Sequence, residues 1–368
     1  MRGRGGGSAA VSLFLSRWFH TQPPVARLCS WQRKEARGGW KIPAPICAGG
    51  SGGAGCPMPL AGGVVPPSAR DPPHPPPEQR RRFGIFTRSL LAARRLQETE
   101  LGTGQYGVTR FSDWTDEEFR GMFWSPPPHT MHQAPQLPRK EPPPFCDWRK
   151  AGAVTAVKDQ GDKCRSCWAF AAVANIESLW NIHFHQPRNL SVQEVLDCSW
   201  CGAGCKGGYA WDAFTTVLHK RGLTSEDAYP YTGRQETCHN LNEPAAYIQG
   251  FQTLPGDEEE IAAHVASTGP ITVTLNSAVM KNYQNGISQP SVMSCSPDQM
   301  DHVVLLVGYG HEKKMQYWII KNSWGEDWGE EGYYRLHRGS NACGITTFPV
   351  TATVNSVEAP GHNVPCPR

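Results

Sequence analysis

The order of apolar and polar positions divides the 368-residue chain into a short helical region and a larger domain. In residues 78–95, apolar side chains recur at spacings of three and four, which is typical of an amphipathic helix. Residues 109–113 alternate like a short strand, and the Thr115-Asp-Glu-Glu118 motif is a capping box that predicts a second helix. A proline-rich linker follows and extends to Pro144.

The larger domain begins at about Phe145, with helices first and strands afterwards. A long amphipathic helix is predicted from Ser166 to about His183, and Ser191 is placed to cap another. After about Pro270 the pattern changes to runs of β-branched and aromatic residues, which predict strands at residues 271–275, 303–307, 317–321 and 333–336. This order predicts an α+β fold with two subdomains.

Composition sets residues 1–77 apart from the rest of the chain. About a third of them are glycine or proline, so we expect this stretch to be disordered. Nine Lys or Arg against two acidic residues give it a charge of about +7, which leaves about −4 for residues 78–368 because the total is +3. The basic character therefore lies outside the predicted domain and gives little support to nucleic-acid binding. A basic RNA-binding arm at residues 1–41 is the one alternative of this kind.

Cysteine content indicates an oxidising compartment, because nine of the 13 cysteines lie between Cys146 and Cys343. A secretory signal would open with a basic start and about 7–15 apolar residues, and the short apolar run at residues 9–15 is a poor match. We therefore expect the true beginning of the protein to be absent from this sequence or replaced. No run of 18 apolar residues occurs, so no transmembrane helix is predicted.

The strongest chemical signal is the segment from Asp159 to Phe170, in which Cys167 falls at the first turn of the long predicted helix. The exposed N–H groups and the dipole of a helix start favour negative charge, so they stabilise a thiolate. A thiolate is the nucleophilic form of cysteine. Cys167 is therefore the candidate nucleophile.

A base and its orienting group follow at the expected distance along the chain. His302 and Asn322 come 135 and 155 residues after Cys167 (302 − 167 and 322 − 167), each beside an apolar strand. The Asn322 amide can fix the imidazole, and Trp324 can shield that bond from water. Gln160 is placed to donate to an oxyanion together with the backbone N–H of Cys167.

Other interpretations of the same residues exist. Cys164-Arg-Ser-Cys167 could be a redox pair, and Cys198-Ser-Trp-Cys201 could be half of a zinc site. Gly207 and Gly208 could form only a turn. The His302 and Asn322 motifs favour nucleophilic catalysis over these alternatives.

From about Glu78 to Val350 the sequence resembles the papain family of cysteine proteases. The likeness rests on the Cys167, His302 and Asn322 motifs and on the motifs at 207–214, 269–274 and 335–344. It implies a papain-like fold, with a left helical subdomain and a right β-sheet or barrel subdomain on either side of a cleft. It also implies a cysteine-type endopeptidase that works through a thioester acyl-enzyme and needs neither a metal nor another cofactor.

The resemblance further implies a proenzyme. Its parts would be a disordered N-terminus at 1–77, an inhibitory propeptide with its linker at 78–144, the peptidase domain at 145–350 and a tail at 351–368. The expected partners are peptide or protein substrates, the protein's own propeptide and cystatin-type inhibitors, with no nucleic acid, and the protein would be a monomer. The expected location is the secretory pathway, in endosomes, lysosomes or the endoplasmic reticulum.

The family pattern also implies particular substrate and structural residues. Residues expected to bind substrate are Gly207, Gly208, Tyr209, Ala210, Met300, Asp301 and Trp324, with Thr274 and Phe348 as further candidates. Implied disulfides are Cys164–Cys205, Cys198–Cys238 and Cys295–Cys343, and Cys146, Cys201 and Cys366 have no counterpart. Asn189-Leu-Ser191 is a sequon for N-glycosylation.

Departures from the family pattern lie beside the nucleophile and in the propeptide. Seven steps separate Gln160 from Cys167 where the family usually has six, and Arg165 stands where the family usually has glycine. Ser89 replaces a usual asparagine in the propeptide motif, and the helix that should precede Glu78 is missing. We therefore expect weak or narrow activity, with an inert, peptide-binding papain-fold protein as the alternative.

Overall fold

A computed structural model describes residues 77–123, 141–199, 202–239 and 243–355. All of these residues belong to one compact unit, Pro77–Arg368, whereas the other unit, Met1–Pro76, lies outside the described residues. The expected disordered N-terminus and RNA-binding arm therefore fall outside the description. So do residues 124–140 of the predicted linker, Cys201 and Cys366.

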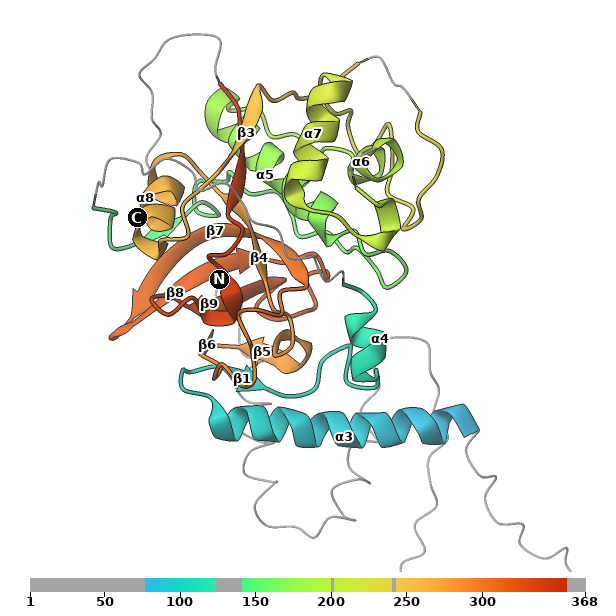
Figure 1. Cartoon of the computed structure of the whole chain (residues 1–368), viewed down its shortest axis with the longest axis vertical. Coiled ribbons are helices and arrows are strands. Elements are labelled where there is room, and N and C mark those ends of the chain that lie inside the picture. Colours follow the sequence, from blue (N-terminus) through green and yellow to red (C-terminus); the bar gives the residue numbers. More distant parts are fainter. Residues whose placement is uncertain (1–76, 124–140, 200–201, 240–242, 356–368) are drawn as a thin grey trace, which may run out of the picture. The chain divides into compact units, whose positions relative to one another are not determined.

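Three helices form one side of the domain (Figure 1): α5 (Cys167–Phe184), α6 (Val192–Cys198) and α7 (Ala210–Lys220). The prediction of α5 and α6 is confirmed. Ser191 caps α6 by accepting a hydrogen bond from the Glu194 N–H at 2.9 Å. Since most side chains of α5 are buried, this helix is the core of the helical side.

The other side is an antiparallel sheet in which β7 (His302–Glu312) is central. The four predicted strands are confirmed within β4, β7, β8 and β9. Only the β6–β9 pair is parallel among the described strands. The strand order is β3 (Gly250–Thr253), β10 (Val350–Thr353), β4 (Ile271–Leu275), β7, β8 (Met315–Lys321), β9 (Tyr333–His337) and β6 (Ile287–Ser288), and β2 (Cys146–Asp147) pairs with β7.

Helix α8 (Glu258–Ser267) packs against the sheet, and α5 packs against β7 from the helical side. Short 3-10 turns complete the described elements: η1 (Gly204–Lys206), η2 (Met280–Asn282) and η3 (Ala342–Gly344). The predicted α+β fold is therefore confirmed, since α5, α6 and α7 precede the sheet strands from β3 onwards and two main apolar clusters form the core. No helix in the described part of the chain is long and apolar enough to cross a membrane.

An N-terminal segment, residues 77–123, lies against the sheet side of the domain (Figure 1). It contains α3 (Pro77–Thr99), β1 (Gln105–Tyr106) and α4 (Asp116–Arg120). Strand β1 pairs antiparallel with β5 (Tyr283–Asn285). On α3, the Ser89 hydroxyl donates to Asn282 Oδ1 at 3.0 Å in a buried contact. The helical periodicity of 78–95 and the capping box of Thr115 and Glu118 are both confirmed.

The predicted strand at residues 109–113 is wrong, because these residues form turns. Hydrogen bonds run from Ser112 N to Thr109 O at 3.1 Å and from Thr109 N to Ser112 Oγ at 2.8 Å. Side chains of Ser and Thr that bond locally to the backbone compete in this way with strand pairing. The alternating pattern thus reflects the burial of Phe111, which is 1% exposed.

Candidate active site

Cys167 is the first residue of α5 and is 2% exposed. Its N-cap residue, Ser166, makes no side-chain capping bond, so the N–H groups of the first turn are left for other acceptors. Backbone N–H groups of Val303, Trp168 and Cys167 lie near enough to the Cys167 sulfur to lower the pKa of its thiol. Because Cys167 begins α5 and Val303 lies on β7, the thiol lies where the helical side of the domain meets the sheet side.

His302 is the first residue of β7, and Asn322 directly follows β8. Nε2 of His302 lies 2.8 Å from Oδ1 of Asn322, which also accepts the Ser323 N–H at 2.9 Å. Nδ1 of His302 has no hydrogen-bond partner among the described residues. With Nε2 held by the Asn322 amide, Nδ1 is the ring nitrogen that remains without a hydrogen bond to the described residues.

Trp324 stacks on the His302 ring, with ring centroids 4.9 Å apart and an interplanar angle of 21°. Trp324 is 1% exposed and Asn322 is 3% exposed. The indole therefore keeps water from the His302–Asn322 bond, which strengthens that bond in a low-dielectric setting.

Burial makes both members of the candidate pair neutral in this structure. It raises the pKa of the Cys167 thiol to about 12 and lowers the pKa of His302 to about 4. This differs from the ionised thiol expected from the sequence, although the N–H groups of Cys167, Trp168 and Val303 act to lower the pKa of the thiol. The reason is the exclusion of water, which penalises any charged form.

Residues 120–123, at the end of α4 and directly after it, exclude that water. The ring centroid of Phe123 lies 4.9 Å from that of His302 and 5.6 Å from that of Trp324. The carbonyl of Gly121 accepts a hydrogen bond from Arg165 Nε at 2.8 Å. The positive charge of Arg120 acts on Asp301. No sequence motif indicated this contact, because the residues come from a different part of the chain.

The N-terminal segment is also fixed beside the site by Arg110. Its guanidinium donates to Asp159 Oδ2 at 2.7 Å and to the Trp324 carbonyl at 2.6 Å. The rings of Phe111 and Phe119 pack edge to face on Trp324, at 5.2 and 5.6 Å between centroids. The segment therefore covers the same tryptophan that covers the His302–Asn322 bond.

The amide of Gln160 is fully buried. Its Oε1 accepts a hydrogen bond from Ser323 Oγ at 2.7 Å, and its Nε2 lies 3.5 Å from the Cys164 carbonyl. A contact of 3.5 Å is at the limit of hydrogen bonding, so the N–H₂ group is only weakly engaged. Tyr231 further fixes this loop, because its hydroxyl donates to Gln160 O at 2.8 Å and lies 2.8 Å from Ser166 Oγ.

Asp301 precedes His302 and is held by Ser277, whose N–H and hydroxyl lie 2.8 and 3.1 Å from its carboxylate oxygens. Burial raises the pKa of Asp301 to about 6, and the hydrogen bonds from Ser277 act in the opposite direction. No sequence motif predicted that Ser277 would hold this carboxylate.

Candidate substrate-binding residues fall into two groups. Tyr209 stacks on Trp211 at 3.8 Å between centroids and lies 6.1 Å from Phe348, so these three rings form one cluster. Met300 lies next to Gly344, where an added Cβ would come within 3.0 Å of Met300 Cγ. Ala210 and Thr274 are buried at 5% and 4% exposure.

The two glycines before Tyr209 have separate requirements. Gly207 has a φ of 117°, which favours glycine. At Gly208, an added Cβ would lie 2.8 Å from the indole of Trp168. Glycine is therefore required at 208 for packing on Trp168, whereas the sequence suggested an approach by substrate or a turn.

Disulfides join Cys164–Cys205, Cys198–Cys238 and Cys295–Cys343, which are the pairs implied by the family pattern. Since Cys164 is bonded to Cys205, it does not form a redox pair with Cys167, which is the free cysteine of the described residues. Asn189 is exposed, and its sequon partner Ser191 is buried. In the described part of the chain, no group of three or more His, Cys, Asp or Glu side chains could hold a metal.

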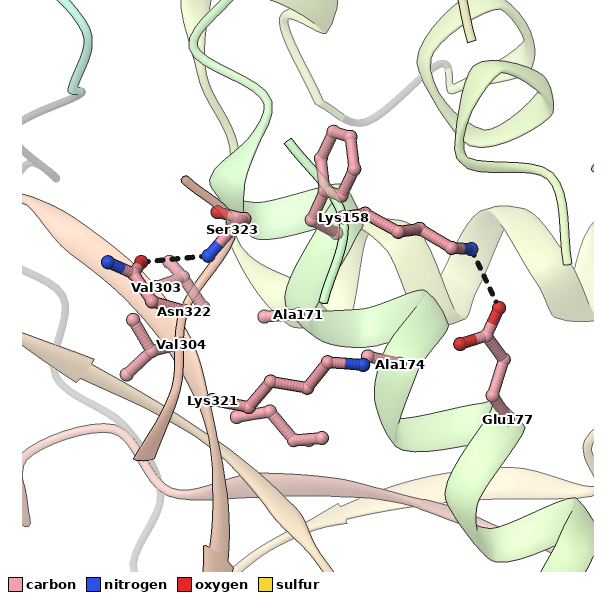
Figure 2. Close-up of a pocket in the computed structure, with 11 residues that line it drawn as sticks. Lys158, Ala171, Ala174, Glu177, Val303, Val304, Lys321, Asn322 and Ser323 are labelled. Atoms are coloured by element: carbon pink, nitrogen blue, oxygen red, sulfur yellow. Dashed lines mark hydrogen bonds and ion pairs between the residues drawn. The ribbon is translucent and has the colours of Figure 1, made fainter. Parts of the chain in front are cut away.

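A small cavity lies behind Asn322 and Ser323, between α5 and the sheet (Figure 2). Its volume is about 20 Å³, which is room for about one water molecule. Figure 2 shows the ion pair of Lys158 Nζ and Glu177 Oε1 on its wall, at 2.8 Å. Burial lowers the pKa of Lys321, another lining residue, to about 8.

Residues 142–353 match the family model described as papain family cysteine protease. The chain is 44% identical over 305 residues to cathepsin W of Mus musculus, which covers 75% of this chain and 81% of the relative. It is also 44% identical over 279 residues to cathepsin F of Mus musculus, covering 74% of this chain and 60% of the relative. A solved procathepsin L2 from Tenebrio molitor has a TM-score of 0.69 and 33% identity, covering 75% of this chain and 93% of that chain.

The chain therefore belongs to the papain family of cysteine proteases. Its fold is papain-like, and its activity class is that of a thiol-dependent hydrolase of peptide bonds. The likeness to cathepsin W, inferred from the motifs at 207–214, 269–274 and 335–344, is confirmed. The alternative of an inert peptide-binding protein is not favoured by these relatives.

Proposed function

We propose that Cys167 is the nucleophile of this protease, His302 its general acid and base, and Asn322 the group that orients the imidazole. The observation that carries the proposal is the 2.8 Å hydrogen bond between His302 Nε2 and Asn322 Oδ1. Nδ1 of His302 has no partner among the described residues, and the N–H of the next residue, Val303, lies near enough to the Cys167 sulfur to lower the pKa of the thiol. This bond fixes the tautomer, because one ring nitrogen is committed and the other remains for the proton of the thiol.

In the reaction, the Cys167 sulfur attacks the carbonyl carbon of the scissile peptide, and its proton goes to His302 Nδ1. The tetrahedral intermediate collapses to a thioester as the C–N bond breaks, and His302 protonates the leaving amine. Water, deprotonated by His302, then attacks the thioester and releases the second product and the thiol. Trp324 excludes bulk water from the His302–Asn322 bond throughout.

The oxyanion of each tetrahedral intermediate would be held by the backbone N–H of Cys167 and by Gln160 Nε2. Removal of one such donor typically lowers the rate by about 10²–10³-fold. In support, Ser323 holds Gln160 Oε1 at 2.7 Å and leaves Nε2 with one long contact at 3.5 Å. The extra residue between Gln160 and Cys167 is accommodated in the loop fixed by Tyr231.

Residues 78–144 would act as an inhibitory propeptide with its linker, 145–350 as the peptidase domain and 351–368 as a tail. The support is that Phe123 and Gly121 contact His302 and Arg165, that the charge of Arg120 acts on Asp301, and that burial keeps the thiol and the imidazole neutral. When the segment leaves, water enters, the penalty on charge falls, and the proton can move from sulfur to imidazole.

Further parts of the proposal concern substrates and cellular setting. Substrates would be extended peptides that contact Gly207, Gly208, Tyr209, Ala210, Met300, Asp301 and Trp324. Cystatin-type inhibitors would compete for the same cleft, and the enzyme would act as a monomer. Three disulfides favour a secretory-pathway location, in endosomes, lysosomes or the endoplasmic reticulum. The exposed Asn189 would carry a glycan.

Labelling with an epoxide or vinyl-sulfone thiol probe tests the proposal. The full chain is labelled before and after proteolytic removal of residues 1–141, with Cys167→Ala as the control. We expect slow labelling of the intact chain, fast labelling of the processed chain at Cys167, and turnover of peptide amides only by the processed chain. Fast labelling without any turnover would contradict the catalytic role of His302.

A further inference from the structure

Arg165 lies two residues before Cys167, on a backbone that is held in place on both sides. Its N–H donates to the Cys205 carbonyl at 3.1 Å, and the preceding residue, Cys164, is bonded to Cys205 by a disulfide. Ser166, which follows, lies 2.8 Å from the hydroxyl of Tyr231. The start of this side chain is therefore fixed relative to the nucleophile, and only its long arm can move.

The guanidinium of Arg165 is directed at a peptide segment rather than at the domain itself. Its Nε donates to the backbone carbonyl of Gly121 at 2.8 Å. Gly121 is two residues from Phe123, whose ring lies against His302, so this peptide crosses the candidate active site. Arg165 thus already binds a peptide carbonyl beside the candidate active site.

The two terminal nitrogens of the guanidinium have no partner in the described part of the chain. Within the described ranges, Nη1 and Nη2 of Arg165 make no hydrogen bond, and no carboxylate lies within ion-pair distance of the side chain. The nearby acidic groups with defined partners are otherwise engaged, Asp159 by Arg110 and Asp301 by Ser277. An arginine normally presents these two nitrogens as a fork that matches a carboxylate.

We propose that Arg165 is a specificity-determining residue that selects an acidic side chain on the substrate residue that supplies the scissile carbonyl. The inference rests on the proposed function, since it needs a cleft that binds and cleaves peptides. When residues 120–123 leave, Nε loses its carbonyl partner, and the whole fork becomes available to a substrate carboxylate.

The geometry limits which substrate residue can be reached. Two residues span at most about 7 Å, so the Cα of Arg165 lies within that distance of the Cα of Cys167. The attacked carbonyl carbon must lie about 3–3.5 Å from the sulfur for reaction. A Glu or Asp side chain on that same residue therefore falls within the reach of the Arg165 arm.

The test uses the processed enzyme and three fluorogenic peptides that differ only in the residue before the scissile bond: Glu, Gln or Lys. The neutral Gln matches Glu in shape, so their ratio isolates the charge. We expect kcat/KM to be at least about 10-fold higher for Glu than for Gln, corresponding to about 1.4 kcal/mol. The Arg165→Gly variant should cleave Glu and Gln peptides equally, and Arg165→Glu should prefer the Lys peptide.

Lys163→Ala is the matched control, because Lys163 is an exposed cation two residues away. It should keep the Glu preference, which excludes a general effect of positive charge. Cleavage of all three peptides with no Glu preference, or a preference that persists in Arg165→Gly, would overturn the inference while leaving the proposed function intact. If no peptide is cleaved although the probe labels Cys167, the proposed function itself fails.

Discussion

The imidazole of His302 is covered on one face by Trp324 and contacted by Phe123, with ring centroids 4.9 Å away in both cases. Trp324 belongs to the peptidase domain, whereas Phe123 comes from the segment that follows α4. The imidazole is thus surrounded by aromatic carbon, which accounts for the fall of its pKa to about 4 through burial.

Phe123→Ala should weaken the latency of the intact chain. Truncation of a nearly fully buried aromatic contact removes roughly 3–5 kcal/mol of packing, so water should reach the thiol and imidazole more often. We expect the intact variant to react with a thiol probe at least 10-fold faster than the intact parent chain. Phe83→Ala is the matched control, because Phe83 is 41% exposed on α3, and it should have little effect. Equal labelling of all three proteins would show that Phe123 does not protect the site.

Asn322→Ala should impair the chemical step more than substrate binding. Without Oδ1, the imidazole loses the bond that selects its tautomer and orientation, and general acid–base catalysis is typically worth about 10²–10⁴-fold. We expect kcat of the processed enzyme to fall by at least about 10²-fold with a small change in KM. Cys167→Ser provides the background rate. A change confined to KM would contradict the orienting role.

The pH dependence of alkylation should differ between the intact and processed chains. In the intact chain the pKa of Cys167 is raised to about 12, so the thiolate forms only at strongly alkaline pH. Alkylation by iodoacetamide should therefore rise continuously up to pH 10, without a plateau. After processing, the thiolate is stabilised by the helix start and by the imidazolium, so the rate should be nearly constant from weakly acidic to neutral pH. Identical profiles would be inconsistent with a neutral pair in the covered state.

Acid should loosen the N-terminal segment through Glu118. The hydrogen bond from Arg82 is the main cause that lowers the pKa of Glu118 to about 2, and the N–H of Thr115 adds to it. A depressed carboxyl pKa stabilises the folded state above the unfolded pKa of about 4.3, and this stabilisation is lost as the pH falls towards 2. Affinity of a peptide of residues 77–123 for the processed enzyme should therefore decrease across that window. The Glu118→Gln peptide should bind more weakly at neutral pH and lose less affinity on acidification.

Glu177→Ala should strongly destabilise the peptidase domain. Glu177 is fully buried and accepts hydrogen bonds from Lys158 Nζ, Thr155 Oγ1 and Leu190 N at 2.8, 2.6 and 2.8 Å. Its removal leaves the ammonium of Lys158 without its carboxylate, which typically costs about 3–5 kcal/mol. Glu98→Ala, at the exposed Arg94–Glu98 pair, is the control and should change the free energy of unfolding by less than about 0.5 kcal/mol. Denaturant unfolding at neutral pH measures both.

The sequence predicted the elements whose signals are local. Strand β4 is recognisable because five successive β-branched or aliphatic residues are all buried, and α6 because Ser191 caps it. Helix α8 was not predicted although it carries a comparable signal, since the Asp257 side chain caps the N–H groups of Glu259 and Glu260. The alternating pattern at 109–113 led to a wrong strand prediction, because Thr109 and Ser112 form local hydrogen bonds with each other in place of strand pairing.

The candidate site shows the same division between local and long-range signals. Cys167, His302 and Asn322 each sit in a short motif at a helix start or a strand end, so they could be identified one by one. Phe123 and Gly121 carry no motif, and their contacts with His302 and Arg165 depend on how distant parts of the chain fold together. The neutral state of Cys167 could not be predicted for the same reason, because it depends on this covering.

The pairing of β1 with β5 has a consequence for the timing of activation. Strand β1 and the buried Ser89–Asn282 contact attach the segment at points remote from Cys167. Cutting the connection between residues 123 and 145 would leave these attachments intact, so the severed piece would stay bound non-covalently to the domain. Cleavage of the connection and exposure of the candidate active site are then two separate events. The slower event, dissociation of β1 and α3 from the domain, would set how long the cleaved protein remains inactive.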